Sequence, residues 1–272
     1  MKKEIYSFNQ IRFTAEVKKI DHYDILNRAF NLRMLDMEKN EEKILFNFIQ
    51  SMKLKGKFIK SQLYQDVFAD YLIGTIYDKT FLEFGATDGL DLSNTHLLEN
   101  YSKWKGVLAE PDPQWHKQLK KNRPNTKIIT DCIWKKSGES LDFLSSQDGV
   151  LSTINLFRDN DKESMPTNAV SRNKKFQTIK VNTLSLNDLI KNEFNDTSPS
   201  YISIDTEGSE YEILQNFNFS KYNPAFLTIE HNFTNNQKFL DELMAKNGYT
   251  RIFRKITSFD GWYVKKEVLN KH

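Results

Sequence analysis

Apolar and polar positions alternate along this chain in two rhythms, which divide it into short strands and amphipathic helices. Four short apolar runs each end in an acid, and these acids are Glu83, Glu110, Asp205 and Glu230. Stretches with helical spacing separate the runs. Strands that alternate with helices predict an α/β fold built on a doubly wound, mainly parallel sheet. Such a sheet places its ligand site at the carboxyl ends of its strands, so we expect the four acids to lie there together.

The same pattern predicts how the chain is organised. Residues 1–60 have helical spacing and contain no proline, which predicts an extension of two or three helices. Residues 61–272 hold the strands and form a predicted α/β domain, which closes with an antiparallel pair at 249–254 and 262–265. Residues 145–175 are polar and rich in turn residues. A loop of that length in a compact domain is usually a lid, a binding loop or disorder, and we expect a lid over the substrate.

The turn after the first predicted strand indicates the type of ligand. Residues 80–89 read TFLEFGATDG, so Gly85 and Gly89 are separated by three residues. Dinucleotide sites use Gly-x-Gly-x-x-Gly, and triphosphate loops continue into Gly-Lys-Ser/Thr. Neither pattern is present here, which argues against a ligand held by its phosphates and against an NAD-dependent oxidoreductase. S-adenosylmethionine has no phosphate and fits this turn, and we expect Gly85 to bring the backbone close to it.

The second strand extends this site. Glu110 follows Gly85 by 25 positions, close to where Rossmann-like units place the acid that accepts two ribose hydroxyls. Pro111 and Pro113 then end the strand. Asp131, after a third strand, is placed to meet an adenine edge, and Cys132 follows it. A simple turn residue at Asp131 and a buried, unreactive thiol at Cys132 are the alternative interpretations.

Several motifs in order resemble the FkbM-type methyltransferases, over about residues 61–264. They are Ser61-Gln62, Gln65-Asp66, the Glu83–Gly89 loop, Ser93-Asn94-Thr95, Leu98-Glu99, Trp104-x-Gly106, Glu110-Pro111, Asn122-Arg123, Asp205-x-Glu207-Gly208 and Glu230. The resemblance implies a Rossmann-like sheet of seven strands, mostly parallel with one antiparallel strand. It also implies a methyltransferase that uses S-adenosylmethionine, usually on oxygen atoms of sugars, polyketides and related products. This chain departs from the family at Thr87, often Asn there, and at His231, often apolar.

Position and resemblance together give the expected cofactor site. Its residues are Glu83, Gly85, Ala86, Thr87, Gly89, Ser93, Asn94, Glu110, Pro111, Asp131, Cys132 and Asp205.

The catalytic group is less settled, and three alternatives remain open. His231 is the first candidate for the base that removes the acceptor's proton, because the ordinary pKa of histidine lies near neutrality. Alternatively, Asp205, Glu230 and His231 bind Mg²⁺ or Mn²⁺, which acidifies the acceptor hydroxyl. Glu207 is a third candidate, again as base. We expect a hydroxyl of a sugar, glycan or secondary metabolite as acceptor, and a catalytically idle binding protein on the same fold is the competing class.

Composition narrows the setting. The net charge of +3 is concentrated in residues 1–60, where 13 basic residues face 8 acidic ones. We interpret this basic segment, with its patch at Lys53, Lys55, Lys57 and Lys60, as a solvated face, and we expect no nucleic-acid partner. No apolar run is long enough to span a membrane, and the N-terminus lacks an apolar signal segment. The single cysteine, Cys132, fits a reducing compartment, so we expect a cytoplasmic enzyme. The N-terminal helices could also form the contact of a homodimer.

Overall fold

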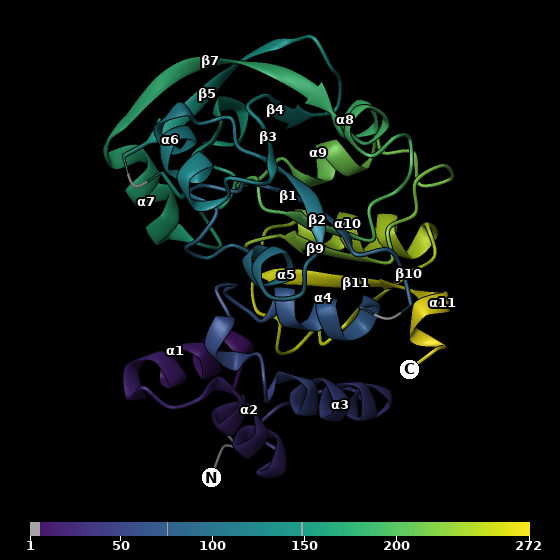
Figure 1. Cartoon of the computed structure of the whole chain (residues 1–272). Helices are drawn as coiled ribbons and strands as arrows, with labels where there is room; N and C mark the ends of the chain where they lie inside the picture. Colours follow the sequence, from purple (N-terminus) through teal and green to yellow (C-terminus); the bar gives the residue numbers. More distant parts are fainter. Residues whose placement is uncertain (1–5, 75, 148) are drawn as a thin grey trace.

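The computed structural model describes residues 6–74, 76–147 and 149–272 (Figure 1). The first five residues of the predicted extension, the side chain of Lys57 in the basic patch, and Asp148 in the predicted lid lie outside the described part.

A seven-stranded sheet forms the centre of the α/β fold. Its strands are β1 (Thr80–Phe84), β2 (Lys105–Ala109), β3 (Lys127–Ile129), β8 (Tyr201–Ile204), β9 (Phe226–Glu230), β10 (Tyr249–Ile252) and β11 (Asp260–Lys265). They lie in the order β10-β11-β9-β8-β1-β2-β3. Neighbouring strands are parallel except that β11 runs antiparallel to both β9 and β10. The predicted seven strands with one antiparallel member are therefore present.

Both faces of this sheet are buried. Along β1, Phe81 belongs to one apolar cluster and Leu82 to the other, and along β9 Phe226 and Leu227 divide in the same way. Side chains in a strand point alternately to opposite faces, so the two clusters lie on the two sides of the sheet. Burial of both faces explains why the strands read as continuous apolar runs.

Four N-terminal helices contribute to the first cluster. They are α1 (Phe8–Lys18), α2 (His22–Asn31), α3 (Glu42–Met52) and α4 (Gln65–Ile73), and α1 to α3 gather at one end of the molecule (Figure 1). The ring centroids of Phe8 and Phe68 lie 5.5 and 4.9 Å from that of Trp262 on β11. The helices at 8–52 thus share one core with the sheet. The division of the chain into 1–60 and 61–272 stays a prediction.

Each of the remaining helices, apart from α7, follows a strand along the chain. They are α5 (His96–Asn100), α6 (Pro113–Asn122), α8 (Leu186–Glu193), α9 (Glu210–Leu214), α10 (Asn236–Lys246) and α11 (Lys266–Leu269), with 3₁₀ turns at Lys39–Glu41, Gly56–Phe58 and Asn155–Phe157. Asp112 caps α6 by accepting a hydrogen bond from the backbone of Gln114, and Pro113 occupies the first helical turn. No helix in the described ranges is long and apolar enough to cross a membrane.

A second sheet was not anticipated from the sequence. Its four strands are β4 (Cys132–Trp134), β5 (Ser140–Ser146), β6 (Thr153–Ile154) and β7 (Phe176–Ser185), in the order β4-β7-β5-β6. Helix α7 (Pro166–Lys174) precedes β7. The predicted lid at 145–175 therefore includes the end of β5, all of β6 and all of α7. The polar sequence of this segment did not predict regular structure, because buried ion pairs, described below, stabilise it in place of apolar contacts.

Candidate functional site

A cavity of about 290 Å³ opens at the carboxyl ends of β1, β2, β8 and β9. Most of the residues predicted for the site line it. These are Glu83, Gly85, Ala86, Thr87, Ser93, Asn94, Glu110, Pro111, Cys132, Asp205, Glu207 and Glu230. Gly89, Asp131 and His231 are not among its lining residues. The four strand-end acids thus share one cavity, as a doubly wound sheet requires.

Glu83, near the end of β1, organises the loop at 93–95. Its carboxylate accepts hydrogen bonds from the Ser93 hydroxyl at 3.0 Å, from the Asn94 backbone N–H at 2.7 Å and from the Thr95 hydroxyl. Burial raises the pKa of Glu83, and the nearby Arg123 guanidinium opposes that rise. Glu83 therefore acts on the site chiefly by holding this loop.

Asn94 lines the cavity and has a buried side-chain oxygen without a hydrogen-bond partner in the described part of the chain. Its side-chain amide donates a hydrogen bond to the Ser203 hydroxyl at 2.9 Å, while its Oδ1 atom is buried and has no partner among the described residues. A buried acceptor without a partner is costly unless a ligand supplies a donor.

Glu110 follows β2 and joins two loops. Its carboxylate accepts the backbone N–H of Thr87 and that of Asp112, each at 2.8 Å. Burial is the main reason that the pKa of Glu110 rises to about 7. Each carboxylate oxygen retains a lone pair, so Glu110 can still accept hydroxyl groups of a ligand. Its partner Thr87 has φ +45°, a backbone conformation that Asn tolerates better than the β-branched Thr.

The two glycines of the loop have structural reasons different from the expected one. Gly85 has φ +79°, and a Cβ atom built there would lie 1.7 Å from the backbone oxygen of Asp205. The close approach is therefore between two turns of the protein rather than between a turn and the ligand alone. A Cβ atom on Gly89 would lie 2.5 Å from Leu119 and 2.7 Å from Arg123, so Gly89 makes room for α6.

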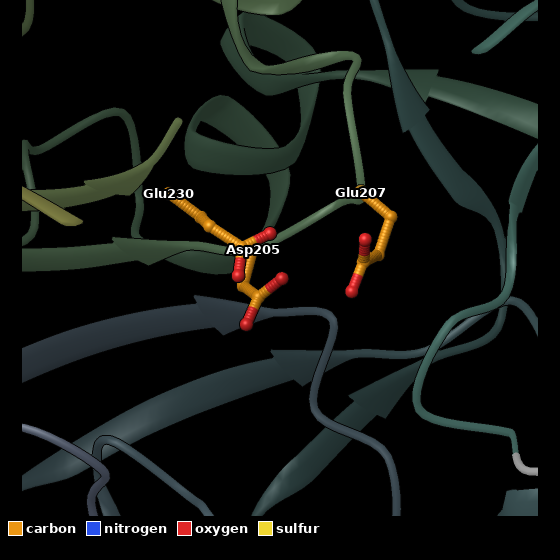
Figure 2. A group of neighbouring side chains, drawn as sticks. All are labelled: Asp205, Glu207 and Glu230. Atoms are coloured by element: carbon orange, nitrogen blue, oxygen red, sulfur yellow. The ribbon is translucent and has the colours of Figure 1, made fainter. Parts of the chain in front are cut away.

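Three carboxylates meet at the other side of the cavity. Asp205 follows β8, Glu207 lies in the next turn, and Glu230 ends β9; one oxygen atom from each lies within 4.8 Å of the others. Figure 2 shows Asp205 and Glu230 side by side and Glu207 directed to the same space. Asn232 bridges two of them, because its side-chain amide donates to Glu230 at 2.8 Å and to Glu207 at 3.4 Å.

The charge of this trio (Asp205, Glu207 and Glu230) is compensated only in part, by the Arg172 guanidinium that lies 2.8 Å from Glu207. Burial, followed by repulsion from neighbouring carboxylates, raises the pKa of Glu230 well above its ordinary value. Burial likewise raises the pKa of Asp205 to about 7, and that of Glu207 well above its ordinary range. Three such groups are stable together when protons or a cation offset their charge.

His231 faces away from this cluster. Its Nδ1 atom accepts the backbone N–H of Phe233 at 3.0 Å, and its Nε2 atom lies 2.8 Å from the guanidinium of Arg251. Burial and the Arg251 charge lower the pKa of His231 to about 3. This position does not favour His231 as base or as metal ligand. Asp131 lies in a separate surface depression with His116 and Lys180.

Sequence reasoning missed several residues of the site. Asn232 follows Glu230 by two positions, a spacing that could have pointed to it, and Gln62 lines the cavity from the Ser61-Gln62 motif. Arg172 offered no signal, because it contacts Glu207 from a distant polar segment. Among the described lining residues six are acids and none is Lys, Arg or His; the acids are Glu83, Asp91, Glu110, Asp205, Glu207 and Glu230.

The fold is an α/β fold whose strand-end acids line one cavity at the carboxyl edge of a mainly parallel sheet. Residues 83–251 match the model of the methyltransferase FkbM domain, which is more than half of the chain. The chain therefore belongs to the FkbM methyltransferase family and is a methyltransferase.

Two solved structures resemble this chain at low identity. A precorrin-6y C5,15-methyltransferase from Geobacter metallireducens GS-15 is 12% identical with a TM-score of 0.37, covering 72% of this chain and 76% of that one. A TehB-like SAM-dependent methyltransferase from Corynebacterium glutamicum ATCC 13032 is 11% identical with a TM-score of 0.36, covering 73% and 87%. No curated protein sequence matches this chain.

Proposed function

We propose that this methyltransferase transfers the methyl group of S-adenosylmethionine to a hydroxyl of a sugar, glycan or secondary metabolite. One observation carries the proposal: a single cavity joins the loop at 83–89, the buried acid Glu110 and the carboxylates of Asp205, Glu207 and Glu230. The first two suit the cofactor, and the carboxylates suit the deprotonation of a hydroxyl.

The cavity fits the polar groups of S-adenosylmethionine. The free Oδ1 atom of Asn94 suits its ammonium group, and Glu110 suits its ribose diol. The sulfonium carries an activated methyl group when the cofactor is bound. The excess of acids around the cavity favours this cation, and the described lining offers no Lys or Arg side chain that a phosphate-bearing cofactor would use.

Methyl transfer to a hydroxyl forms an O–C bond, breaks the C–S bond and releases the hydroxyl proton. The oxygen atoms of Asp205, Glu207 and Glu230 form a hard, anionic donor set close enough to share one divalent cation such as Mg²⁺ or Mn²⁺. Such a cation would acidify the acceptor hydroxyl. The chain's own part is to hold the three carboxylates in place, which Asn232 does for two of them.

A second mechanism without metal is favoured by the raised pKa values of Glu207 and Glu230. A carboxylate with a raised pKa is a stronger base than usual, so either group can take the acceptor's proton directly. This mechanism retains Glu207 in the role of base and leaves His231 outside the reaction.

The charge of the residues that line the cavity also indicates which acceptors can bind. Because its charged groups in the described part are all acidic, we propose an uncharged or cationic acceptor rather than a phosphorylated one. Leu92 and Val150 line the cavity and are 40% and 42% exposed, so they offer apolar contacts at its edge. A cytoplasmic location, which the buried free thiol of Cys132 suits, and a homodimer through the N-terminal helices complete the proposal.

Thermal unfolding in the presence of ligands tests this function. Titrated S-adenosylmethionine should raise the unfolding temperature to a plateau, while NAD⁺ and ATP should leave it unchanged. With labelled cofactor and a panel of neutral, amino and phosphorylated sugars, transfer should stop in EDTA and return with Mg²⁺ or Mn²⁺. Absence of any stabilisation by S-adenosylmethionine would sink the proposal, whereas transfer that ignores EDTA would select the metal-free mechanism.

A further inference from the structure

Arg172, on α7 in the insertion, is fully buried although it carries a permanent charge. All five of its N–H groups have acceptors. Nε donates to the backbone oxygen of Leu151 at 2.8 Å, and Nη1 donates to the backbone oxygen of Arg158 at 2.9 Å. The other bonds go to the carboxylates of Asp161, at 2.8 and 3.2 Å, and of Glu207, at 2.8 Å. A buried arginine with every donor used has a single orientation.

Asp161 orients the Arg172 guanidinium independently of Glu207. It belongs to the same insertion, is buried, and accepts both Nη atoms of Arg172 in a bidentate pair. The pair neutralises most of the cost of burying the guanidinium. Arg172 therefore reaches Glu207 as a fixed donor, held by three points of the insertion.

The turn that carries Glu207 has an unusual backbone conformation. Glu207 has φ +57° and precedes Gly208 with φ +124°, so the turn after β8 is held away from the common conformations. Thr153 of the insertion stabilises this turn as well, since its hydroxyl lies 3.2 and 3.0 Å from the backbone oxygens of Thr206 and Glu207. The insertion thus holds both the main chain and the side chain of Glu207.

This contact also decides which oxygen of Glu207 is available. Oε2 accepts hydrogen bonds from Arg172 and from Asn232. Its other oxygen, Oε1, accepts no hydrogen bond from the described residues and is left for a ligand that Asp205 and Glu230 bind with it. A carboxylate tied by one oxygen presents the other in a fixed direction, which is how outer partners orient the ligands of a metal.

We propose that Arg172 is a positioning residue for the cation site, through which the insertion at 145–175 completes the trio of carboxylates. This rests on the proposed function in its cation-dependent form. The planar, five-donor fork is essential to the role, and the charge alone is insufficient, because an ammonium group cannot reach Leu151, Arg158, Asp161 and Glu207 together.

Arg172→Lys tests the fork and keeps the charge. We expect Mn²⁺, followed by the electron paramagnetic resonance of the free ion, to bind at least about 10-fold more weakly to this variant than to the parent protein. The affinity for S-adenosylmethionine, measured by calorimetry, should stay within about twofold. Arg158→Lys is the matched control: its guanidinium, also in the insertion, lies over the Phe176 ring and contacts Asn173 rather than the trio, and Mn²⁺ affinity should be unchanged.

The outcomes separate the inference from the function on which it rests. If the parent protein binds S-adenosylmethionine but no Mn²⁺, or if Arg172→Lys binds Mn²⁺ as well as the parent, the positioning role is overturned and the methyltransferase proposal stands. If the parent binds no S-adenosylmethionine, the proposed function itself fails. Should Arg172→Lys unfold, Asp161→Asn loosens the same fork, and it too must weaken Mn²⁺ binding for the inference to survive.

Discussion

Glu110 illustrates, at the scale of a single residue, how one buried carboxylate serves the fold and the ligand together. It holds the backbone N–H groups of Thr87 and Asp112, and its pKa rises to about 7 because burial disfavours its charge. A carboxylate in that state gains stability when ligand hydroxyl groups replace the water it has lost. The same group therefore shapes the loop at 83–89 and, in the proposed function, would accept the hydroxyl groups of the ligand.

Replacement of Glu110 should weaken the cofactor complex strongly. In Glu110→Ala the loss of a bidentate charged acceptor should cost on the order of 2–3 kcal/mol of binding free energy for S-adenosylmethionine, measured by calorimetric titration. Asp142→Ala, which removes an acid from an exposed ion pair on β5, is the control and should bind normally. An affinity of Glu110→Ala within about twofold of the parent would rule out the ribose contact.

At the scale of secondary-structure elements, the site depends on how closely two strand-end turns approach. The turn after β1 at Gly85 meets the turn after β8 at Asp205, and no side-chain atom fits between them. That contact places the loop at 83–89 beside the first carboxylate of the trio. The spacing of glycines along the sequence shows that a side chain is excluded but does not show which part of the molecule excludes it.

Gly85→Ala should therefore lower stability, and with it ligand binding. We expect a loss of more than about 2 kcal/mol in the free energy of unfolding, because the methyl group meets a backbone oxygen and φ is positive. Gly138→Ala is a matched control with the same φ of +79° but nothing within 4 Å of the added atom, and only the smaller conformational cost of about 1 kcal/mol should remain. Urea denaturation compares the two, and equal losses would contradict the backbone clash.

At the scale of the whole molecule, burial of acids makes the stability of the ligand-free protein depend on pH. Burial raises the pKa of Glu110, Asp205 and Asp260 to about 7 and that of Asp66 to about 6. In the unfolded chain these groups titrate near 4. Between these values the native state binds more protons than the unfolded state, so the free energy of unfolding falls as pH rises.

We accordingly expect the ligand-free protein to lose stability from about pH 5 to pH 8. Each of these protons contributes a slope of up to about 1.4 kcal/mol per pH unit. Urea denaturation at several pH values, without cofactor or divalent cation, measures the slope. Glu110→Gln removes one titrating group and should flatten it; a stability that rises over this range would show that the buried acids are ionised throughout.

Much of the fold follows from the sequence because strand and helix patterns are local. The order of strand-end acids predicted their meeting at one edge, and Glu83, Glu110, Asp205 and Glu230 all line the cavity. The second sheet escaped prediction because β6 has only two residues and the polar segment around it is ordered by Arg172 and Asp161. Arg172 and Asp161 lie far from Glu207 in the chain, so no hydrophobic periodicity in the sequence indicates that they contact it.

By itself the sequence determined the α/β class, the family and the acids at the strand ends, since each rests on residues close together in the chain. Only the tertiary structure decided which polar groups stand together. After β9 the backbone turns at Asn232 and Phe233, both with positive φ, which directs His231 toward Arg251 and brings the amide of Asn232 to Glu207 and Glu230. Arg172 reaches Glu207 across 35 positions, a contact that packing alone creates. The acids could be predicted because a strand end is marked by residues close together in the sequence. Their partners could not, because those contacts depend on how distant turns meet in space.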